Sequence, residues 1–553
     1  MRICYLYSMR IIVILFIWLL GCKPSSNQNT VAPKQETVDY FSNRNHGVIG
    51  DSAMVVSAHP EASKVGMAIL QQGGNAVDAA IAVQFALAVV YPNAGNIGGG
   101  GFMVTRMKDG SSNALDFREK APSTASRDMF INPANGEVNR KLIETSHLAS
   151  GVPGSVAGMW EAHQKYGSMD WKKLLQPAIE LAQKGFPITA HQAEDFNQLQ
   201  AELKQLNKGK NYFIKSKWNA NDTLIQTDLA TTLIAIRDKG RDGFYTGTVA
   251  EKIAAEMQQH NGIISTDDLK NYQAVWREPI KGTYKNYTII SMPPPSSGGI
   301  ALMQLLNMME NYPLKKWGFH SVNSVSIMTE AEKRVYADRA TWLGDPDFTK
   351  VPKNELISKS YSASRMQNVD TNSVTPAAQI KAGTFTGYES EETTHFSIVD
   401  KYGNAVSITT TLNDSYGSRI IVNGCGFILN NEMDDFSAKP GEPNLYGLIG
   451  GEANAIAPGK RMLSSMTPTI VEKDGQLFMV VGTPGGSTII TSVFQNIINV
   501  IEFDMTMQEA VDAPRFHNQW LPDEIKIEND FNETTVAALK AKGYKITDRE
   551  AIG

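Results

Sequence analysis

Cysteine is scarce in this sequence, and its scarcity excludes several kinds of protein. Only 3 cysteines occur among 553 residues, namely Cys4, Cys22 and Cys425. They cannot form the disulfide framework on which small secreted domains depend. The sequence also has no CxxC and no HExxH pattern, and its 9 histidines are scattered. We therefore expect neither a cysteine-rich nor a zincin-type metal site.

Long runs of charge of one sign are absent too. The formal net charge is -5, and charged residues make up 20% of the chain. Nucleic-acid-binding proteins carry a basic stripe or patch, so we expect no nucleic-acid partner. Hydrophobic residues reach 42%, which is ordinary for a globular protein, and the chain is long enough for a large buried core.

The N-terminus is typical of an exported lipoprotein. Ile11–Leu20 is an unbroken apolar run, too short to span a bilayer, and it ends in Gly21-Cys22. This junction resembles a lipobox, at which the cysteine is lipidated and becomes the new N-terminus. A plain secretory signal with an incidental cysteine is the alternative. We expect a signal peptide over 1–22, a flexible polar tether over 23–45, and an envelope protein anchored to the membrane by lipid.

Three segments predict β-hairpins, because each pairs apolar or β-branched runs across an Asp/Gly turn. They span residues 102–117, 396–412 and 469–481. Helices are predicted between them: Glu61–Gln72, the nearly all-apolar Asn75–Val90, solvent-facing helices within 155–260, and an amphipathic Ser487–Phe503. Alternating helices and hairpins favour a layered α+β fold with helices packed on sheets.

Residues 366–391 differ from their surroundings, because Thr, Ser, Asn, Ala and Gly dominate them. We expect an exposed linker that runs directly into Glu392-Thr393, where a strand begins. An exposed linker next to a strand is a place where the chain tolerates a cut.

A cut before Thr393 would change its chemistry. An internal threonine hydroxyl is a poor nucleophile, whereas an N-terminal threonine has its own α-amine as a base. The intrinsic pKa of that amine is roughly 7.7–8.0, so much of it is unprotonated near neutral pH. Threonine is also a common strand residue, so this pattern alone is weak evidence for catalysis.

Glycine-rich segments supply further candidates. Val480–Ser487 reads as a strand, a glycine turn and a helix start, where backbone N–H groups can face an anion. This suits an oxyanion hole, although an ordinary tight turn explains it equally well. Gly98–Gly101 does not match a dinucleotide fingerprint, and we expect close backbone packing there.

Several motifs together resemble the γ-glutamyltranspeptidase family over roughly residues 45–553. They follow the family's order along the chain: Asn96–Phe102, Leu115–Pro122, Pro294–Gly299, Thr393–Asp400, Thr411–Asn413, Leu429–Phe436, Leu463–Thr469, Gly482–Ser487 and Ala513–His517. The resemblance implies an N-terminal-nucleophile hydrolase with a four-layer αββα sandwich. It also implies a precursor that cuts itself into a large subunit, 46–392, and a small subunit, 393–553, which stay together.

The resemblance also implies roles for individual residues. Thr393 would be the nucleophile, Thr411 would support it, and Gly485 and Gly486 would form the oxyanion hole. The α-carboxylate of a γ-glutamyl group would be held by Arg118, Ser464 and Ser465, and its α-amine by Asn413, Glu432 and Asp435. Arginine is suited to bidentate carboxylate binding, and carboxylates suit an ammonium. A surface ion pair of Arg118 with Glu119, and a turn or cap at Glu432 and Asp435, are the plainer alternatives.

The polar loop Ser437–Gly451 matches the family's lid, which implies that Tyr446 stands at the substrate gate and favours the glutathione-type members. His395 lies two residues from Thr393, and we expect it to be structural rather than a general base. The family normally continues past the point matching Gly553, so we expect this sequence to lack a final outer strand and to expose a sheet edge.

Three functions fit this sequence. The first is γ-glutamyl transfer and hydrolysis, in which glutathione or another γ-glutamyl amide acylates Thr393 and water, an amino acid or a peptide accepts the group. The second is a related acylase or poly-γ-glutamate hydrolase with the same nucleophile. The third is an inactive lipid-anchored binding protein. None of them requires a cofactor or metal.

Overall fold

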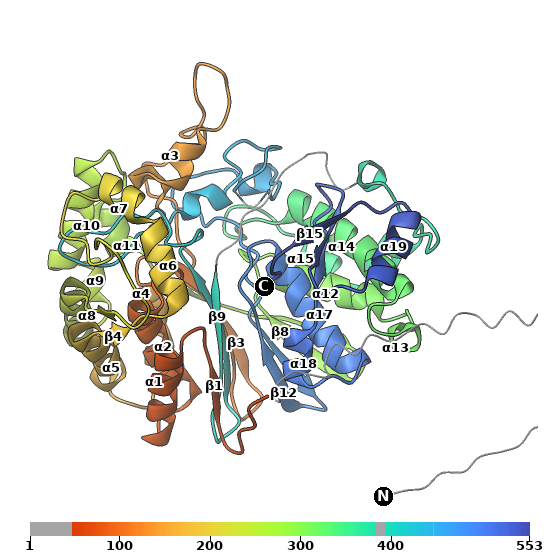
Figure 1. The fold of residues 1–553 in the computed structure, drawn as a ribbon, viewed down its shortest axis with the longest axis horizontal. Coiled ribbons are helices and arrows are strands. Elements are labelled where there is room, and N and C mark those ends of the chain that lie inside the picture. The colour runs from red at the N-terminus through yellow and green to blue at the C-terminus, as the bar shows by residue number, and fades with distance from the viewer. Residues whose placement is uncertain (1–46, 382–392, 446) are drawn as a thin grey trace, which may run out of the picture. The chain divides into compact units, whose positions relative to one another are not determined.

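Two antiparallel sheets face each other at the centre of the computed structural model, which describes residues 47–381, 393–445 and 447–553 (Figure 1). Hydrogen bonds join the sheets: the Ser407 hydroxyl donates to the Val481 carbonyl (3.2 Å) and accepts from the Thr469 N–H (3.0 Å). The six-stranded sheet has the order β1 (Met54–Val56), β9 (Thr394–Val399), β10 (Ala405–Thr411), β2 (Gly100–Arg106), β3 (Ser112–Asp116), β6 (Val275–Arg277). The four-stranded sheet has the order β12 (Gln476–Val481), β11 (Thr469–Lys473), β8 (Tyr287–Ser291), β7 (Ile280–Tyr284).

The three predicted hairpins are confirmed. They are β2–β3, β9–β10 and β11–β12, and in each the two strands pair antiparallel. Two small sheets lie outside the central pair. One contains β13 (Phe516–His517), β14 (Ile525–Glu528) and β15 (Ile546–Arg549), and the other contains β4 (Phe186–Pro187) and β5 (Thr223–Leu224).

A first layer of helices packs against the outer face of the six-stranded sheet. At its centre α2 (Ala76–Val90) is buried along its whole length, as its apolar sequence predicts. Asn75 caps α2, and Asp400 in the β9–β10 turn accepts a hydrogen bond from the Ala76 N–H (2.9 Å), which fixes the helix to the sheet. The same side of the molecule contains α1 (Pro60–Gln71), α3 (Arg140–Glu144), α4 (Ser155–Tyr166), α5 (Trp171–Lys184), α6 (Ala190–Gln198), α7 (Gln200–Leu206), α8 (Thr227–Lys239), α9 (Asp242–Tyr245), α10 (Gly247–Gln259) and α11 (Thr266–Asn271).

A second layer covers the four-stranded sheet. Its long helices are α12 (Gly298–Met309), α14 (Val322–Trp342) and α17 (Thr488–Glu502). The helix predicted over 487–503 is confirmed as α17, and its polar face is covered too: all its residues except Val500 and Ile501 are buried. Shorter helices complete the layer: α13 (Leu314–Trp317), α15 (Lys353–Leu356), α16 (Lys359–Met366), α18 (Met507–Asp512) and α19 (Glu533–Ala541).

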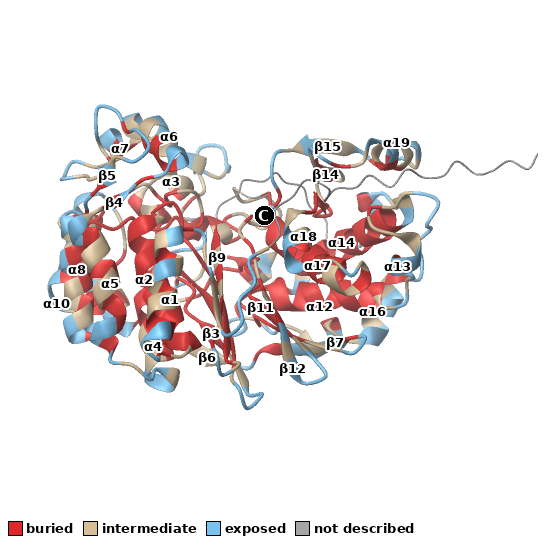
Figure 2. Cartoon of the chain, turned by 60° about the horizontal axis from the view of Figure 1, so that its bottom comes forward, coloured by how far each residue is buried: buried red, intermediate tan, exposed pale blue. Residues whose placement is uncertain are grey.

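The architecture is therefore helix, sheet, sheet, helix, which confirms the predicted α+β four-layer αββα sandwich. Figure 2 shows buried residues concentrated along the sheets and the inner sides of both helical layers. Alternation along β2 explains this: Met103 belongs to the core under the first helical layer, whereas Phe102 and Val104 belong to the core on the other side.

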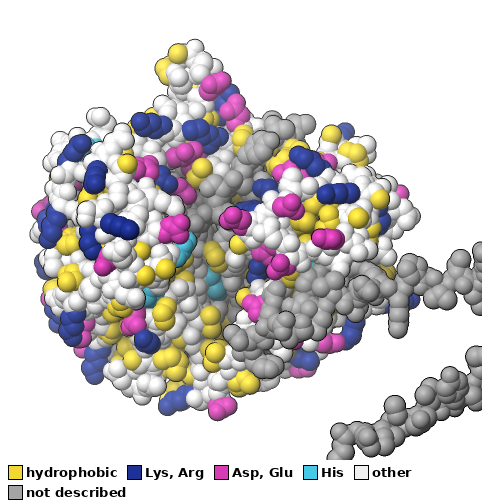
Figure 3. Space-filling model, viewed as in Figure 1, with side chains coloured by type: hydrophobic (Ala, Val, Ile, Leu, Met, Phe, Trp, Pro, Cys, Tyr) yellow, Lys and Arg dark blue, Asp and Glu magenta, His cyan; other side chains and the backbone are white. Residues whose placement is uncertain are grey.

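Two features of the surface complete the description. Acidic and basic side chains are interspersed over the face shown in Figure 3. Among the described residues, no helix has the length and apolar character needed to cross a bilayer.

Candidate active site

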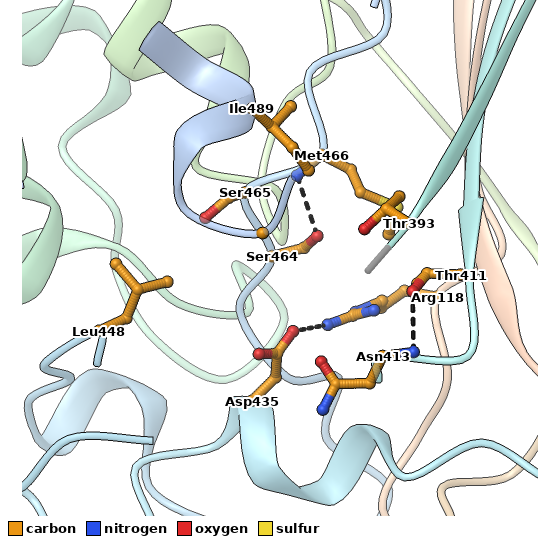
Figure 4. Close-up of a pocket in the computed structure, with 11 residues that line it drawn as sticks. Arg118, Thr393, Thr411, Asn413, Asp435, Leu448, Ser464, Ser465, Met466 and Ile489 are labelled. Atoms are coloured by element: carbon orange, nitrogen blue, oxygen red, sulfur yellow. Dashed lines mark hydrogen bonds and ion pairs between the residues drawn. The ribbon is translucent and has the colours of Figure 1, made fainter. Parts of the chain in front are cut away.

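A pocket at one end of the two sheets brings together eight of the residues predicted for the site (Figure 4). Its empty volume is about 270 Å³. The predicted residues among its lining are Arg118, Thr393, Thr411, Asn413, Asp435, Ser464, Ser465 and Gly486, and the others are Leu448, Met466 and Ile489.

Thr393 lies immediately before the first residue of β9 and is only 6% exposed. The register of β9 and β10 pairs Thr394 with Thr410, which places Thr393 opposite Thr411. The Thr411 hydroxyl accepts a hydrogen bond from the Asn413 N–H (2.8 Å). Asn413 has a φ of 81°, a strained value for a residue with a side chain, so this bond helps to hold it in place.

The glycine turn between β12 and α17 forms another wall. Gly485 and Gly486 have φ values of 122° and 56°, which favour glycine. The Gly485 carbonyl accepts from both the Thr488 N–H (3.0 Å) and the Thr488 hydroxyl (2.8 Å), so the turn is fixed at the start of the helix. Gly486 lines the pocket, whereas Gly485 precedes it and is not among the lining residues. The N-terminal end of α17 thus provides a positive potential beside Thr393.

Arg118 lies at the centre of a buried charged cluster. It is fully buried, and its guanidinium pairs with Glu432 (2.6 Å), Glu119 (3.4 Å) and Asp435. The resemblance implies that Arg118 binds the α-carboxylate of the substrate and that Glu432 and Asp435 bind its α-amine. In the structure these three side chains contact one another. The surface ion pair considered for Arg118 is excluded by its burial. Glu432 and Asp435 lie on one short 3₁₀ turn, Glu432–Asp435.

The cluster is electrostatically unbalanced. Burial would lower the pKa of Arg118, but the carboxylates of Glu432, Asp435 and Glu119 outweigh it and raise that pKa. Burial raises the pKa of Glu119 to about 7, and it also raises the pKa values of Glu432 and Asp435. Burial thus favours the protonated forms of these carboxyl groups, and a cationic group of a ligand beside them would favour the ionised forms.

The serine pair is held by groups that the sequence did not point to. The Ser464 hydroxyl accepts a hydrogen bond from the Met466 N–H (3.2 Å). The backbone carbonyl of Ser464 accepts two more, from the N–H (2.8 Å) and the hydroxyl (2.7 Å) of Ser297. Arg339 on α14 donates to the hydroxyls of Ser465 (3.1 Å) and Ser297 (2.9 Å). Arg339 was missed because nothing in the local sequence of a long helix shows which arginine faces the site.

Comparison with known proteins shows which family combines these features. The family model described as "Gamma-glutamyltranspeptidase" matches residues 62–553. The chain belongs to the γ-glutamyltranspeptidase family. It is thus an enzyme of the N-terminal-nucleophile hydrolase type.

Individual relatives of this γ-glutamyltranspeptidase-family chain agree. It is 50% identical over 511 residues to a glutathione hydrolase proenzyme of Escherichia coli (strain K12), covering 92% of this chain and 88% of the relative. A crystal structure of Helicobacter pylori γ-glutamyltranspeptidase is 44% identical, with a TM-score of 0.58 over 61% of this chain and 97% of that one. A cephalosporin acylase from Bacillus halodurans is 26% identical, with a TM-score of 0.82 over 94% and 93% of the two chains.

In this γ-glutamyltranspeptidase-family chain the segment predicted to be a lid turns back at the pocket. Pro443 and Ile449 form an antiparallel bridge. The Asn444 amide donates to Asp435 (3.1 Å), and the Leu445 N–H donates to Asp434 (2.6 Å). Leu448 lines the pocket, a contact that the sequence reading missed, whereas Tyr446 lies outside the described residues.

His395 and the Gly98–Gly101 run contact neighbouring strands and do not line the pocket. The His395 imidazole hydrogen-bonds to the hydroxyls of Thr409 (2.9 Å) and Ser397 (3.0 Å), and burial lowers its pKa to about 3. It is not among the pocket's lining residues. Close backbone packing at the glycine run is confirmed: a Cβ at Gly99 would stand 2.1 Å from the carbonyl oxygen of Thr411.

Proposed function

We propose that this enzyme cuts its own chain between Glu392 and Thr393 and then uses Thr393 to transfer or hydrolyse γ-glutamyl groups. The large subunit would be 46–392 and the small subunit 393–553. Burial of Thr393 beside Thr411 and the glycine turn supports the role of its hydroxyl. Glu392 lies outside the described residues.

The observation that carries this proposal is the Arg118–Asp435 pair in the pocket of Thr393. A γ-glutamyl group has an α-carboxylate and an α-ammonium on one carbon. The carboxylate can take the place of Asp435 on the Arg118 guanidinium, while the ammonium pairs with the released Asp435 and with Glu432. The substrate thus replaces the buried Arg118–Asp435 pair by two pairs, and it adds no net charge to the cluster.

The reaction then proceeds by acylation of Thr393 followed by release of the acyl group. The free α-amine of Thr393 takes the hydroxyl proton as the oxygen attacks the γ-amide carbon. The N–H groups of Gly485 and Gly486 stabilise the oxyanion. The C–N bond breaks as the amine leaving group takes the proton, and a γ-glutamyl ester of Thr393 remains. Water, an amino acid or a peptide then attacks the ester and regenerates the hydroxyl.

We propose glutathione and other γ-glutamyl amides as donors. The name of the Escherichia coli relative, glutathione hydrolase, supports this choice. A second candidate is acylase activity, which the apolar side of the pocket formed by Leu448, Met466 and Ile489 favours.

Two anilides distinguish these candidates, because they differ only in the α-amine. γ-Glutamyl-p-nitroanilide has the amine, and glutaryl-p-nitroanilide lacks it. We expect the γ-glutamyl compound to have the higher kcat/KM, since Asp435 and Glu432 would remain without a cation in the glutaryl complex. A preference for the glutaryl compound would identify an acylase.

Processing is tested on a denaturing gel. We expect two fragments, with the smaller beginning at Thr393 by N-terminal sequencing, whereas Thr393→Ala should remain one chain. Thr393→Ser is the matched control, since it retains a hydroxyl and should still be cut. Cleavage of Thr393→Ala at the same bond would show that Thr393 is not the attacking group, and an uncut wild-type chain would favour an inactive binding protein.

We also propose that Cys22 is lipidated and anchors the enzyme to the membrane from the periplasm or exterior. The apolar run Ile11–Leu20 followed by Gly21-Cys22 supports this proposal, and these residues lie outside the described structure. Cys22→Ser should abolish incorporation of a labelled fatty acid during expression. Labelling that persists in this variant would contradict the anchor.

A further inference from the structure

Two histidines and a glutamate meet on the outer side of the first helical layer, away from the pocket. His147 and Glu256 are 109 positions apart in the sequence, yet the His147 Nε2 and a Glu256 carboxylate oxygen are 3.1 Å apart. The His260 Nε2 lies 3.6 Å from the same oxygen. One ligand-type atom from each of the three residues lies within 4.8 Å of the other two.

Two elements position these side chains. Glu256 lies on α10, and His260 follows its last residue, so the i, i+4 spacing places both on one face. His147 begins a 3₁₀ turn, His147–Ala149, whose N-cap is Ser146. The two imidazole rings stack with centroids 4.7 Å apart and an interplanar angle of 20°. The cluster is thus formed by the helix end and the turn together.

These distances match those around a tetrahedral metal. With metal–ligand bonds of about 2.0–2.1 Å, two ligands of a tetrahedral site stand about 3.3–3.4 Å apart. The two measured separations from the Glu256 oxygen, 3.1 and 3.6 Å, lie on either side of that value. The ligand-type atoms of the two histidines lie within 4.8 Å of each other, and the stacked rings would turn apart so that both nitrogens face one ion.

Burial and hydrogen bonding also suit a metal site. The side chains of His147 and Glu256 are 9% and 11% exposed, while that of His260 is 36% exposed. The second Glu256 oxygen accepts from the Asn423 N–H at 3.4 Å, a bond of the kind that orients ligating carboxylates. An ion would be held from the protein side and remain open toward solvent.

We propose that His147, Glu256 and His260 bind one divalent ion of the zinc class. Two imidazoles and one carboxylate suit Zn²⁺, Co²⁺ or Ni²⁺, whereas Mg²⁺ and Ca²⁺ prefer sites made of oxygen ligands. Three protein ligands leave a fourth position for water. The site is independent of the γ-glutamyl chemistry and of processing.

The ion would connect α10 to the segment that supports the substrate loop. Close to His147 in the chain, the Glu144 carbonyl accepts from the Asn431 amide (3.0 Å), and the Gly151 N–H donates to Asn430 (2.8 Å). Asn430 and Asn431 directly precede Glu432. Because the ion binds the folded chain, occupancy should raise thermal stability with rising metal concentration.

Titration calorimetry of the chelator-treated full chain with ZnCl₂ tests the site. We expect one equivalent to bind, and His260→Ala to weaken that binding about tenfold or more. His260 is suited to removal because its side chain is 36% exposed and it follows the last residue of α10. His191→Ala is the matched control: His191 also faces an acid four residues away, Asp195 at 3.8 Å, but its side chain is 78% exposed and no second histidine of the described residues joins it there. Equal affinity in wild type and His260→Ala would overturn the proposal.

Cobalt gives a second readout that a change in stability alone would not produce. Bound Co²⁺ should show the visible bands of a tetrahedral site without a thiolate charge-transfer band, because Cys425 is not one of the three residues that form the cluster. Glu256→Gln should weaken those bands while the ultraviolet circular dichroism of the chain stays unchanged. A thiolate band, or bands that are unchanged in Glu256→Gln, would place the metal elsewhere and refute the assignment.

Discussion

The two helical layers bury very different side chains. In α2 every residue is buried, and only Asp78 and Gln84 are polar among them. In α14 the run from Ser324 to Ala340 is also buried, yet it contains six charged residues: Glu330, Glu332, Lys333, Arg334, Asp338 and Arg339. One helix thus buries apolar surface, and the other buries charge.

The difference separates two roles of buried side chains: stabilising the fold and positioning the loops around the site. Apolar burial stabilises a fold directly, whereas buried ion pairs contribute little net stability and are costly to break. The polar groups of α14 instead fix loops around the site. Tyr336 donates to the Ser487 carbonyl, Arg339 to Ser465, and Glu332 accepts from the Asn518 N–H (2.9 Å). The buried polar groups of α14 thus hold the loops around the pocket in place, whereas the apolar burial of α2 stabilises the fold.

Arg118→Met should have the largest effect, because it leaves Glu119, Glu432 and Asp435 buried without their cation. We expect the free energy of unfolding to fall by about 3–5 kcal/mol and the activity on γ-glutamyl-p-nitroanilide to be lost. Urea unfolding in the Thr393→Ala background measures the first effect on a single chain. Arg118→Lys retains the charge and should be affected less; a Met variant as stable as its parent would contradict the role of the ion pairs.

Leu87→Ala should destabilise the apolar layer without touching the site. Leu87 is fully buried in α2, and the cavity left by its removal should lower the free energy of unfolding by about 2–5 kcal/mol. The KM of the folded enzyme should be unchanged. A large shift in KM would mean that the two layers do not divide stability and positioning as described.

Arg339→Lys should affect binding more than folding. A lysine cannot reach Ser465 and Ser297 together, and the lost charged hydrogen bond is worth about 1.5–3 kcal/mol. We expect KM for a γ-glutamyl donor to rise about tenfold or more with little change in kcat. Arg334→Lys, on the same helix but paired with Glu330 at 2.7 Å, should leave KM unaltered.

Asp434 provides an effect that is seen only as a change with pH. Burial raises its pKa to about 8, from an unfolded value near 3.8. The folded chain therefore binds more protons between these values, so this group's contribution to stability is full below about pH 4 and is lost as the pH rises toward 8. Asp434→Asn should remove that part of the slope in unfolding experiments across this range. An identical slope in the variant would show that Asp434 is ionised throughout.

The sequence predicted local structure well where its pattern repeats over short distances. The hairpins follow from two-residue alternation and Asp/Gly turns, and α2 follows from its apolar length. The site residues were identified by motif resemblance, and eight of them line the pocket. Their mutual pairing was not predicted, since the contact of Arg118 with Asp435 spans 317 positions.

What the sequence could not indicate depends on the packing of distant segments. Helical period alone does not show that α17 is covered on both sides, or that Arg339 among the charged residues of α14 faces the serines. The scattered histidines suggested no metal cluster, and only the fold brings His147 to the end of α10. In each case the decisive neighbour lies on another element.

The strand order has a consequence for the life of the mature enzyme. Strands from after Thr393 alternate with strands from before it: β9 and β10 lie between β1 and β2, and β11 pairs with β8. Once the chain is cut, each fragment completes the two central sheets of the other, and neither has an intact central sheet on its own. Separation of the fragments is then equivalent to unfolding, and their recovery becomes a second-order reaction that slows on dilution. The uncut precursor folds as a single chain in a unimolecular process. After cleavage, refolding requires that two separate fragments meet.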